Sequence, residues 1–190
     1  ITLEEAGAGS LAGVTSDVAT VATANATAAS AVTLVAGETS VLTTGLDNKT
    51  TGATNDTFAA TAATVATATV STLNAGDNLR GGDGTDTLTL SNTSATAAFG
   101  AGVSTSSIEN LSVNAVTATS VDTSLMAGLT GVTNNGSLNA VTVTGLTTIP
   151  SVSVIASSAD TTVTMGAAAT VGAADEMTVN LNGAATTLGS

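Results

Sequence analysis

Residues 78–90 read NLRGGDGTDTLTL, and this stretch decides how the rest of the chain is interpreted. Three glycines and two aspartates are followed by Leu88 and Leu90, which alternate with threonine. Glycine lets the backbone turn tightly, and apolar residues at a period of two indicate a strand with one apolar face. The stretch therefore predicts a tight turn that leads directly into a β-strand.

Similar short runs recur from residue 41 onward. They are rich in Thr and Val and are bounded by Gly, Asn, Asp or Ser, as in TATVSTLNAG, IENLSVNAV, PSVSVIASS, TTVTMGA and EMTVNLNG. Their polar positions hold Thr, Ser or Asn, residues that suit stacked strands better than an ordinary charged surface. We predict an all-β fold, a parallel β-solenoid or β-roll in which each coil stacks on the one before. A β-sandwich, which also has short strands at this spacing, is the alternative.

Two local signals add detail to this prediction. Asn134, Asn135 and Gly136 predict a tight turn, because Asn and Gly tolerate positive φ. Pro150 is expected to open a strand, where its missing N–H costs least.

Residues 1–40 differ from the remainder because they are Ala-rich and contain few turn residues after Gly13. Two interpretations are open for them: a helical or flexible arm that becomes ordered against a partner, or two strands, ITLEE and AVTLVAG, joined by a loose connector. We predict an N-terminal arm or assembly segment over 1–40 and the β-solenoid domain over 41–190.

Composition excludes several classes of function. The chain has 14 acidic residues against Lys49 and Arg80, a formal net charge of −12, so nucleic acid is not an expected partner. It contains no Cys and no His, and no apolar run long enough for a transmembrane segment. It also lacks the Trp and Tyr that usually stack on sugar beside the paired carboxylates of a glycosidase, so we do not expect an enzyme.

The opening stretch fits the nonapeptide Gly-Gly-x-Gly-x-Asp-x-U-x, where U is a large aliphatic residue, over residues 81–89. Calcium prefers six to eight oxygen ligands, and a glycine turn exposes carbonyl oxygens next to a carboxylate. Asp77 lies nine residues before Asp86, which we take as one turn of the roll, so the two carboxylates should meet across stacked turns. We predict a calcium site that involves Asp77, Gly82, Gly84 and Asp86, with Asp83 in solvent.

A degraded copy of the same pattern lies upstream in LTTGLDNKTTGATNDTFAA. Asp47 again precedes a second acidic residue, Asp56, by nine positions, and Phe58 follows two residues later. We predict a second, weaker calcium site that involves Asp47, Asn55 and Asp56. The alternative is ordinary turn capping by Asp and Asn.

The stretches LTTGLDN, NDTF, TLNAGDNLRGGDGTDTL, IENLSV and ADEMTVNLNG together resemble calcium-binding, repeats-in-toxin-type surface-layer proteins and large secreted adhesins of Gram-negative bacteria. The resemblance covers residues 41–183. It implies a calcium-stabilised β-roll or β-solenoid, exported by a type I pathway with an uncleaved C-terminal signal and located at the cell surface. Such proteins usually carry several tandem nonapeptides, whereas this chain has one good copy and one poor copy.

Two functions follow from this resemblance. The first is a structural subunit of a calcium-dependent surface layer or self-assembling cell-surface filament, whose partners would be copies of itself and cell-surface polysaccharide. The second is a stalk or binding module of a large secreted calcium-binding adhesin. In either role an exposed strand edge would invite stacking or an incoming strand.

Overall fold

The computed structural model describes residues 36–95, 98–171 and 176–183. Most of the predicted N-terminal arm, and its alternative as two strands, lies outside these ranges. The first described strand, β1 (Thr39–Val41), begins inside the predicted arm. It is paired with a strand of the solenoid, so residues 39 and 40 are part of the stacked fold.

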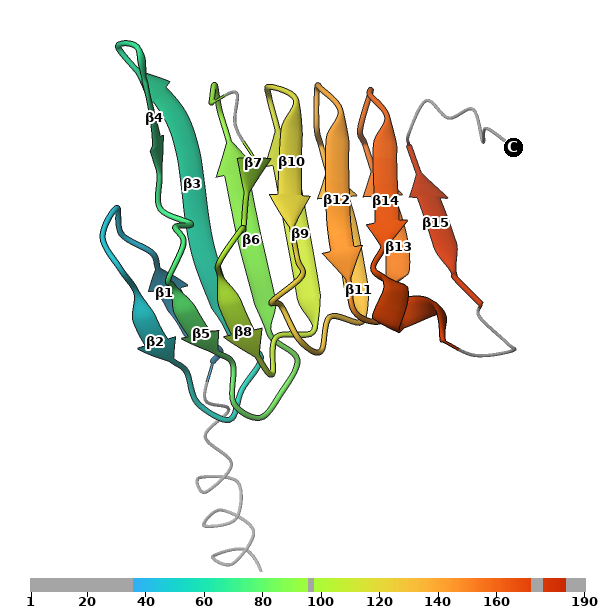
Figure 1. Cartoon of the computed structure of the whole chain (residues 1–190), viewed down its shortest axis with the longest axis horizontal. Helices are drawn as coiled ribbons and strands as arrows, with labels where there is room; N and C mark the ends of the chain where they lie inside the picture. Colours follow the sequence, from blue (N-terminus) through green and yellow to red (C-terminus); the bar gives the residue numbers. More distant parts are fainter. Residues whose placement is uncertain (1–35, 96–97, 172–175, 184–190) are drawn as a thin grey trace, which may run out of the picture. The chain divides into compact units, whose positions relative to one another are not determined.

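The described residues form a parallel β-solenoid, as predicted, and not a β-sandwich (Figure 1). One sheet, the long sheet, runs through the whole unit. Its strands, each parallel to its neighbours, are β1, β3 (Thr57–Val65), β6 (Thr87–Asn92), β9 (Asn110–Ala115), β11 (Gly131–Asn135), β13 (Ser151–Ile155) and β15 (Val179–Asn182).

Two smaller parallel sheets complete the coils. The second sheet consists of β7 (Ala98–Phe99), β10 (Thr119–Asp122), β12 (Val141–Leu146) and β14 (Thr161–Met165). The short sheet consists of β2 (Asn48–Thr50), β5 (Asn78–Arg80) and β8 (Ser104–Ser106). A 3-10 helix, η2 (Ala167–Thr170), follows β14.

The length of a coil changes along the solenoid while the register of the strands is kept. Residues paired across neighbouring coils of the long sheet are 18 positions apart between β1 and β3, 30 between β3 and β6, and 23 between β6 and β9. They are 21 apart between β9 and β11, 20 between β11 and β13, and 27 between β13 and β15. The coil is therefore much longer than the nine-residue turn expected from the sequence.

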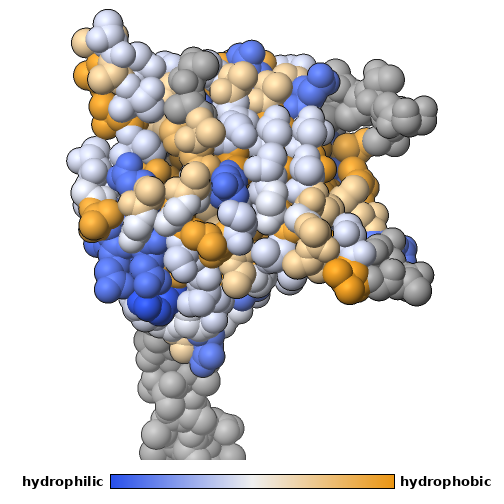
Figure 2. Space-filling view, viewed as in Figure 1, coloured by the Kyte–Doolittle hydropathy of each residue, from blue (hydrophilic) through white to orange (hydrophobic). Residues whose placement is uncertain are grey.

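The core consists of columns of apolar side chains from successive coils. In the long sheet Phe58 lies beside Leu88, Leu88 beside Leu111, and Leu111 beside Val132, and all four are buried. In β6 and β9 the residues that alternate with the apolar ones on the outer face are Thr, Ser or Asn and are only partly buried. The period-two alternation predicted from the sequence thus separates an apolar interior from a hydroxyl-rich exterior, and the face in Figure 2 is mostly of intermediate hydropathy.

One hairpin interrupts the parallel order. β4 (Ala68–Ser71) runs antiparallel to the end of β3, and Ala66 in the turn between them has a φ of 57°. The long strand β3 therefore extends beyond its neighbour β6, and Thr64 is held there by a hydrogen bond from its amide to Ser94 Oγ.

Of the two local predictions, the strand that starts at Pro150 is confirmed in full and the turn around Asn134 to Gly136 only in part. β13 begins directly after Pro150, as predicted. Gly136 has a φ of 67° and ends β11, which confirms the turn, but Asn134 lies within β11 and is fully buried. Its side chain donates to Thr161 Oγ1 and accepts from Ser157 Oγ, so hydrogen bonds compensate for its burial.

Within the part of the chain that the structure describes, no helix has both the length and the hydropathy needed to span a membrane.

The columns predict a sharp contrast between two neighbouring residues of β9. Leu111→Ala should lower the free energy of unfolding by about 2–5 kcal/mol, because it opens a cavity in a closely packed core. Ser112→Ala, on the outer side of the same strand, should change it by less than about 0.5 kcal/mol. Urea unfolding followed by circular dichroism measures both, and similar losses in the two variants would contradict the assigned register.

Candidate functional site: two buried acidic columns

Five acidic side chains lie at two corners of the solenoid. The long acidic column contains Asp56, Asp86 and Glu109, which each precede a strand of the long sheet. The short acidic column contains Asp47 and Asp77, which precede strands of the short sheet. The four aspartates are at most 4% exposed, so the chain buries acidic groups that most proteins leave in water.

The long acidic column is built from hydrogen bonds that run from coil to coil. The Asp56 amide donates to Asp86 Oδ1 at 2.7 Å, and the Asp86 amide donates to Glu109 Oε2 at 2.8 Å. The Glu38 amide likewise donates to Asp56 Oδ1, at 2.5 Å, from the preceding coil. Each carboxylate thus accepts the backbone N–H of the residue one coil earlier.

The short acidic column follows the same rule. The Asp47 amide donates to Asp77 Oδ1 at 2.9 Å, and the Asn74 amide donates to Asp77 Oδ2 at 2.7 Å. Asp47 Oδ2 accepts the Thr43 amide at 2.7 Å, and Lys49 Nζ lies 3.9 Å from Asp47 Oδ1. Both carboxylates close a corner, and that of Asp77 also ties its corner to the neighbouring coil.

This arrangement corrects the predicted pairing of the acids. Asp77 was expected to stack on Asp86, and Asp47 on Asp56, nine residues apart. The structure instead stacks Asp47 on Asp77 and Asp56 on Asp86, in both cases 30 residues apart. The nine-residue partners lie in the same coil, on opposite sides of the glycine turn.

The glycine turn at residues 81–84 has the tight backbone conformation that the sequence predicts. Gly82 and Gly84 have φ values of 91° and 119°, which residues with a side chain rarely adopt. A Cβ on Gly81 would lie 1.8 Å from the Ser107 carbonyl oxygen and 2.2 Å from Asp86 Oδ2. Glycine is therefore required at position 81, because the Asp86 carboxylate is packed against that backbone.

The two copies of the motif lie on top of one another. The Thr85 amide donates to Asn55 Oδ1 at 2.9 Å, and the Asp83 amide donates to the Gly52 carbonyl at 3.2 Å. The degraded copy therefore supports the good copy from the neighbouring coil. Asp83 has an exposed side chain, in agreement with the prediction that it lies in solvent.

Asp86 differs from the other aspartates because one of its oxygens is unsatisfied. It is fully buried, and Oδ2 has no hydrogen-bond partner among the described residues. Burial raises the pKa of Asp86, and the charges of Asp56 and Glu109 add to the rise, although the Asp56 amide opposes it. The pKa of Asp56 is lowered instead, chiefly by the hydrogen bond from the Glu38 amide.

A calcium ion at these residues would need six to eight oxygen ligands. Both oxygens of Asp56 and of Asp77 already accept protein donors, and Asn55 Oδ1 accepts an amide. In the described ranges no group of three or more His, Cys, Asp or Glu side chains could hold a metal ion. The calcium sites predicted at these residues stay predictions. Asp86 is the most direct place to test them, because its Oδ2 has no hydrogen-bond partner among the described residues.

Glu109 is not among the site residues predicted from the sequence, although the sequence carries a signal for it. Asp56, Asp86 and Glu109 each stand two positions before an inward-facing residue, Phe58, Leu88 and Leu111 respectively. The local sequence pattern of this corner is thus an acidic residue followed, two positions later, by a large apolar residue.

The comparisons with known proteins add no relative. No protein-family model matches the chain, and no curated protein or solved structure matches it either. The roles of these residues therefore rest on the geometry of the solenoid itself.

The calcium prediction has a direct test at Asp86. If calcium binds there, it should raise the melting temperature of the chain relative to a chelator, and Asp86→Ala should abolish that shift. Asp83→Ala, on the exposed side of the same turn, should keep it. The calcium-induced shift is compared within each variant, since Asp86→Ala also removes the acceptor of the Asp56 amide. Equal shifts in the two variants, or none in the unaltered chain, would exclude Asp86 as a ligand.

A pH prediction follows from the raised pKa of Asp86. The folded chain holds this proton more tightly than the unfolded chain, so its contribution to stability is lost as the pH rises from the ordinary value of 3.8 through the raised pKa. Asp86→Asn keeps an oxygen for the Asp56 amide and removes the charge. In chelator at pH 7 it should therefore be more stable than the unaltered chain, by on the order of 1 kcal/mol.

The control for that experiment is Asp56, because its pKa is shifted in the opposite direction from that of Asp86. Its contribution is present above 3.8 and is lost as the pH falls through the lowered pKa, so Asp56→Asn should destabilise the chain at pH 7. Urea unfolding between pH 3 and pH 8 separates the two, and a destabilising Asp86→Asn at neutral pH would contradict the assignment.

Proposed function

We propose that this chain is a structural, non-catalytic subunit that self-associates into an extracellular surface layer or filament. The observation that carries the proposal is the open stack of parallel strands. β1 and β15, at the two ends of the long sheet, each pair with one strand among the described residues. A strand edge of this kind presents unpaired backbone donors and acceptors to another chain.

The acidic residues support a structural role over a catalytic one. Asp47, Asp56, Asp77 and Asp86 are buried, and seven of their eight oxygens are engaged with protein donors or with Lys49. A general acid or nucleophile has to reach its substrate from the wall of a cleft. The carboxylates of Asp56, Asp77 and Asp86 instead connect one coil to the next, and that of Asp47 closes a corner of its own coil.

The exterior supports an extended, weakly charged contact surface. Along the long sheet the outward positions of β6, β9 and β13 are Thr, Ser or Asn, apart from Ile155 at the end of β13. Such a surface offers hydroxyl and amide groups at regular intervals without strong like-charge repulsion between copies. The extracellular location and the polysaccharide partner rest on the resemblance of the glycine motif alone.

The proposal is tested by electron microscopy of the purified chain, with and without calcium. Ordered sheets or fibres are the expected result, and light scattering should show growth with protein concentration. Chains that remain monomeric at every concentration and calcium level would contradict the assembly proposal and favour the adhesin stalk instead.

A further inference from the structure

We infer that two copies of this chain associate through the C-terminal ends of their solenoids, around β14 and β15, and not head to tail. The inference rests on the proposed function, since it specifies how the self-association begins. It is drawn from a difference between the two ends of the stack.

The C-terminal end exposes residues that belong to the core. Val152 and Val154 of β13 are 4% and 6% exposed, whereas Val179 and Leu181, which lie beside them on β15, are 42% and 40% exposed. The apolar columns therefore continue to the last described coil without a polar residue to close them. Burying such side chains is favourable at roughly 25 cal/mol per Å² of apolar surface.

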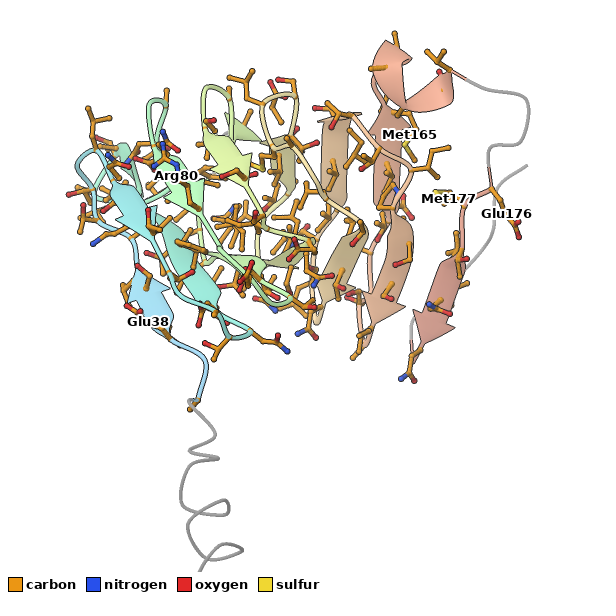
Figure 3. All side chains as sticks on the ribbon, turned by 90° about the horizontal axis from the view of Figure 1, so that it is seen from below. Glu38, Arg80, Met165, Glu176 and Met177 are labelled. Carbon is orange, nitrogen blue, oxygen red and sulfur yellow. The ribbon has the colours of Figure 1, made fainter. Side chains whose placement is uncertain are left out.

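The second sheet ends in the same way. Val163 and Met165 of β14 continue the column of Val143 and Leu146 and are only partly buried against the core. Figure 3 shows Met165 and Met177 at this end of the unit, and Met177 is 45% exposed. Two sheets thus contribute to one apolar end surface.

The opposite end of the stack has polar residues at two of its inward positions. At inward positions of its first coil, Ser40 lies beside Phe58, and Lys49 lies beside Leu79. Both Phe58 and Leu79 are fully buried, so these polar residues form the last layer over the core. The Lys49 ammonium group is within 3.9 Å of Asp47 Oδ1, which keeps it paired at this surface.

These two ends do not complement each other. Head-to-tail stacking in register would place Ser40 of one copy beside Val179 of the next, because both belong to the long-sheet column of Phe58 and Val152, and burying a hydroxyl group without a partner is costly. Contact between two C-terminal ends places apolar groups against apolar groups. β14 and β15 contain no charged residue, so a two-fold axis brings no like charges together within these strands.

The backbone favours the same arrangement. In Figure 1, β15 is the last strand of its row, at the side away from β1, and its second edge has no partner in the described ranges. A two-fold axis would pair the β15 strands of two copies antiparallel, which satisfies both edges by one set of hydrogen bonds.

Crosslinking tests this inference cleanly because the chain contains no cysteine. Asn180→Cys places one thiol on β15, Thr39→Cys places one on β1, and Ser112→Cys places one on β9 in the middle of the stack. With a short bis-maleimide, the Asn180→Cys chain alone should give a dimer of twice the 17.9 kDa chain mass, whereas the other two variants alone should remain monomers.

Crosslinking mixtures of two cysteine variants distinguishes a failure of this inference from a failure of the proposed function. If Asn180→Cys crosslinks only to Thr39→Cys, the chains assemble head to tail, so the inference is wrong and self-association stands. If no variant or mixture crosslinks, both are wrong. A cysteine at position 180 that reacts with maleimide only after unfolding would show that this chain covers its own end, and would also overturn the inference.

A pair of charge substitutions provides a second measurement. Leu181→Glu should abolish the dimer in light scattering, because it places two charges near the two-fold axis. Val41→Glu, at an exposed position of β1, should leave the dimer intact. Circular dichroism verifies that both variants fold, and a dimer that survives Leu181→Glu would contradict the proposed contact.

Discussion

Every coil of this solenoid has to place an apolar side chain beside the one in the coil before it. Parallel strands obtain their hydrogen bonds and their packing from their neighbours, and a slip by one residue would turn the whole apolar row outward. The long acidic column lies two residues before that row and hydrogen-bonds to the backbone of the preceding coil. These hydrogen bonds help to fix the register at the corner, before β3, β6 and β9 begin.

The acidic columns also explain how a chain with so few charged groups tolerates some of them in its interior. An isolated buried carboxylate is unfavourable, but one that accepts two or three backbone amides is stabilised in its ionised form. Asp77 and Asp56 satisfy this condition. Asp86 does so only in part, because its Oδ2 is unpaired and two other acids are its neighbours. The strongest sequence motif therefore coincides with the least compensated charge.

The fold was predictable because alternation of apolar and polar residues is a local property of the chain. Leu88 and Leu90 are recognisable as inward residues without knowledge of their neighbours, and the glycine turn before them requires no tertiary information. The stacking partners of the acids were not predictable in this way. The separation of Asp56 and Asp86 depends on how many residues the intervening loops contain, and no side-chain pattern encodes that number. Asn134 is a similar case, because an Asn next to Gly indicates a turn, whereas only the Thr161 and Ser157 partners explain its place in the core.

The variation of the coils between 18 and 30 residues has a consequence for how such a protein can evolve. All of the variation in length falls between the strands of the long sheet, which keep their register throughout. Insertions and deletions in these connections would alter the corners and the smaller sheets without displacing the apolar columns. Lineages could thus vary the outline of the solenoid, coil by coil, while the long sheet is inherited unchanged.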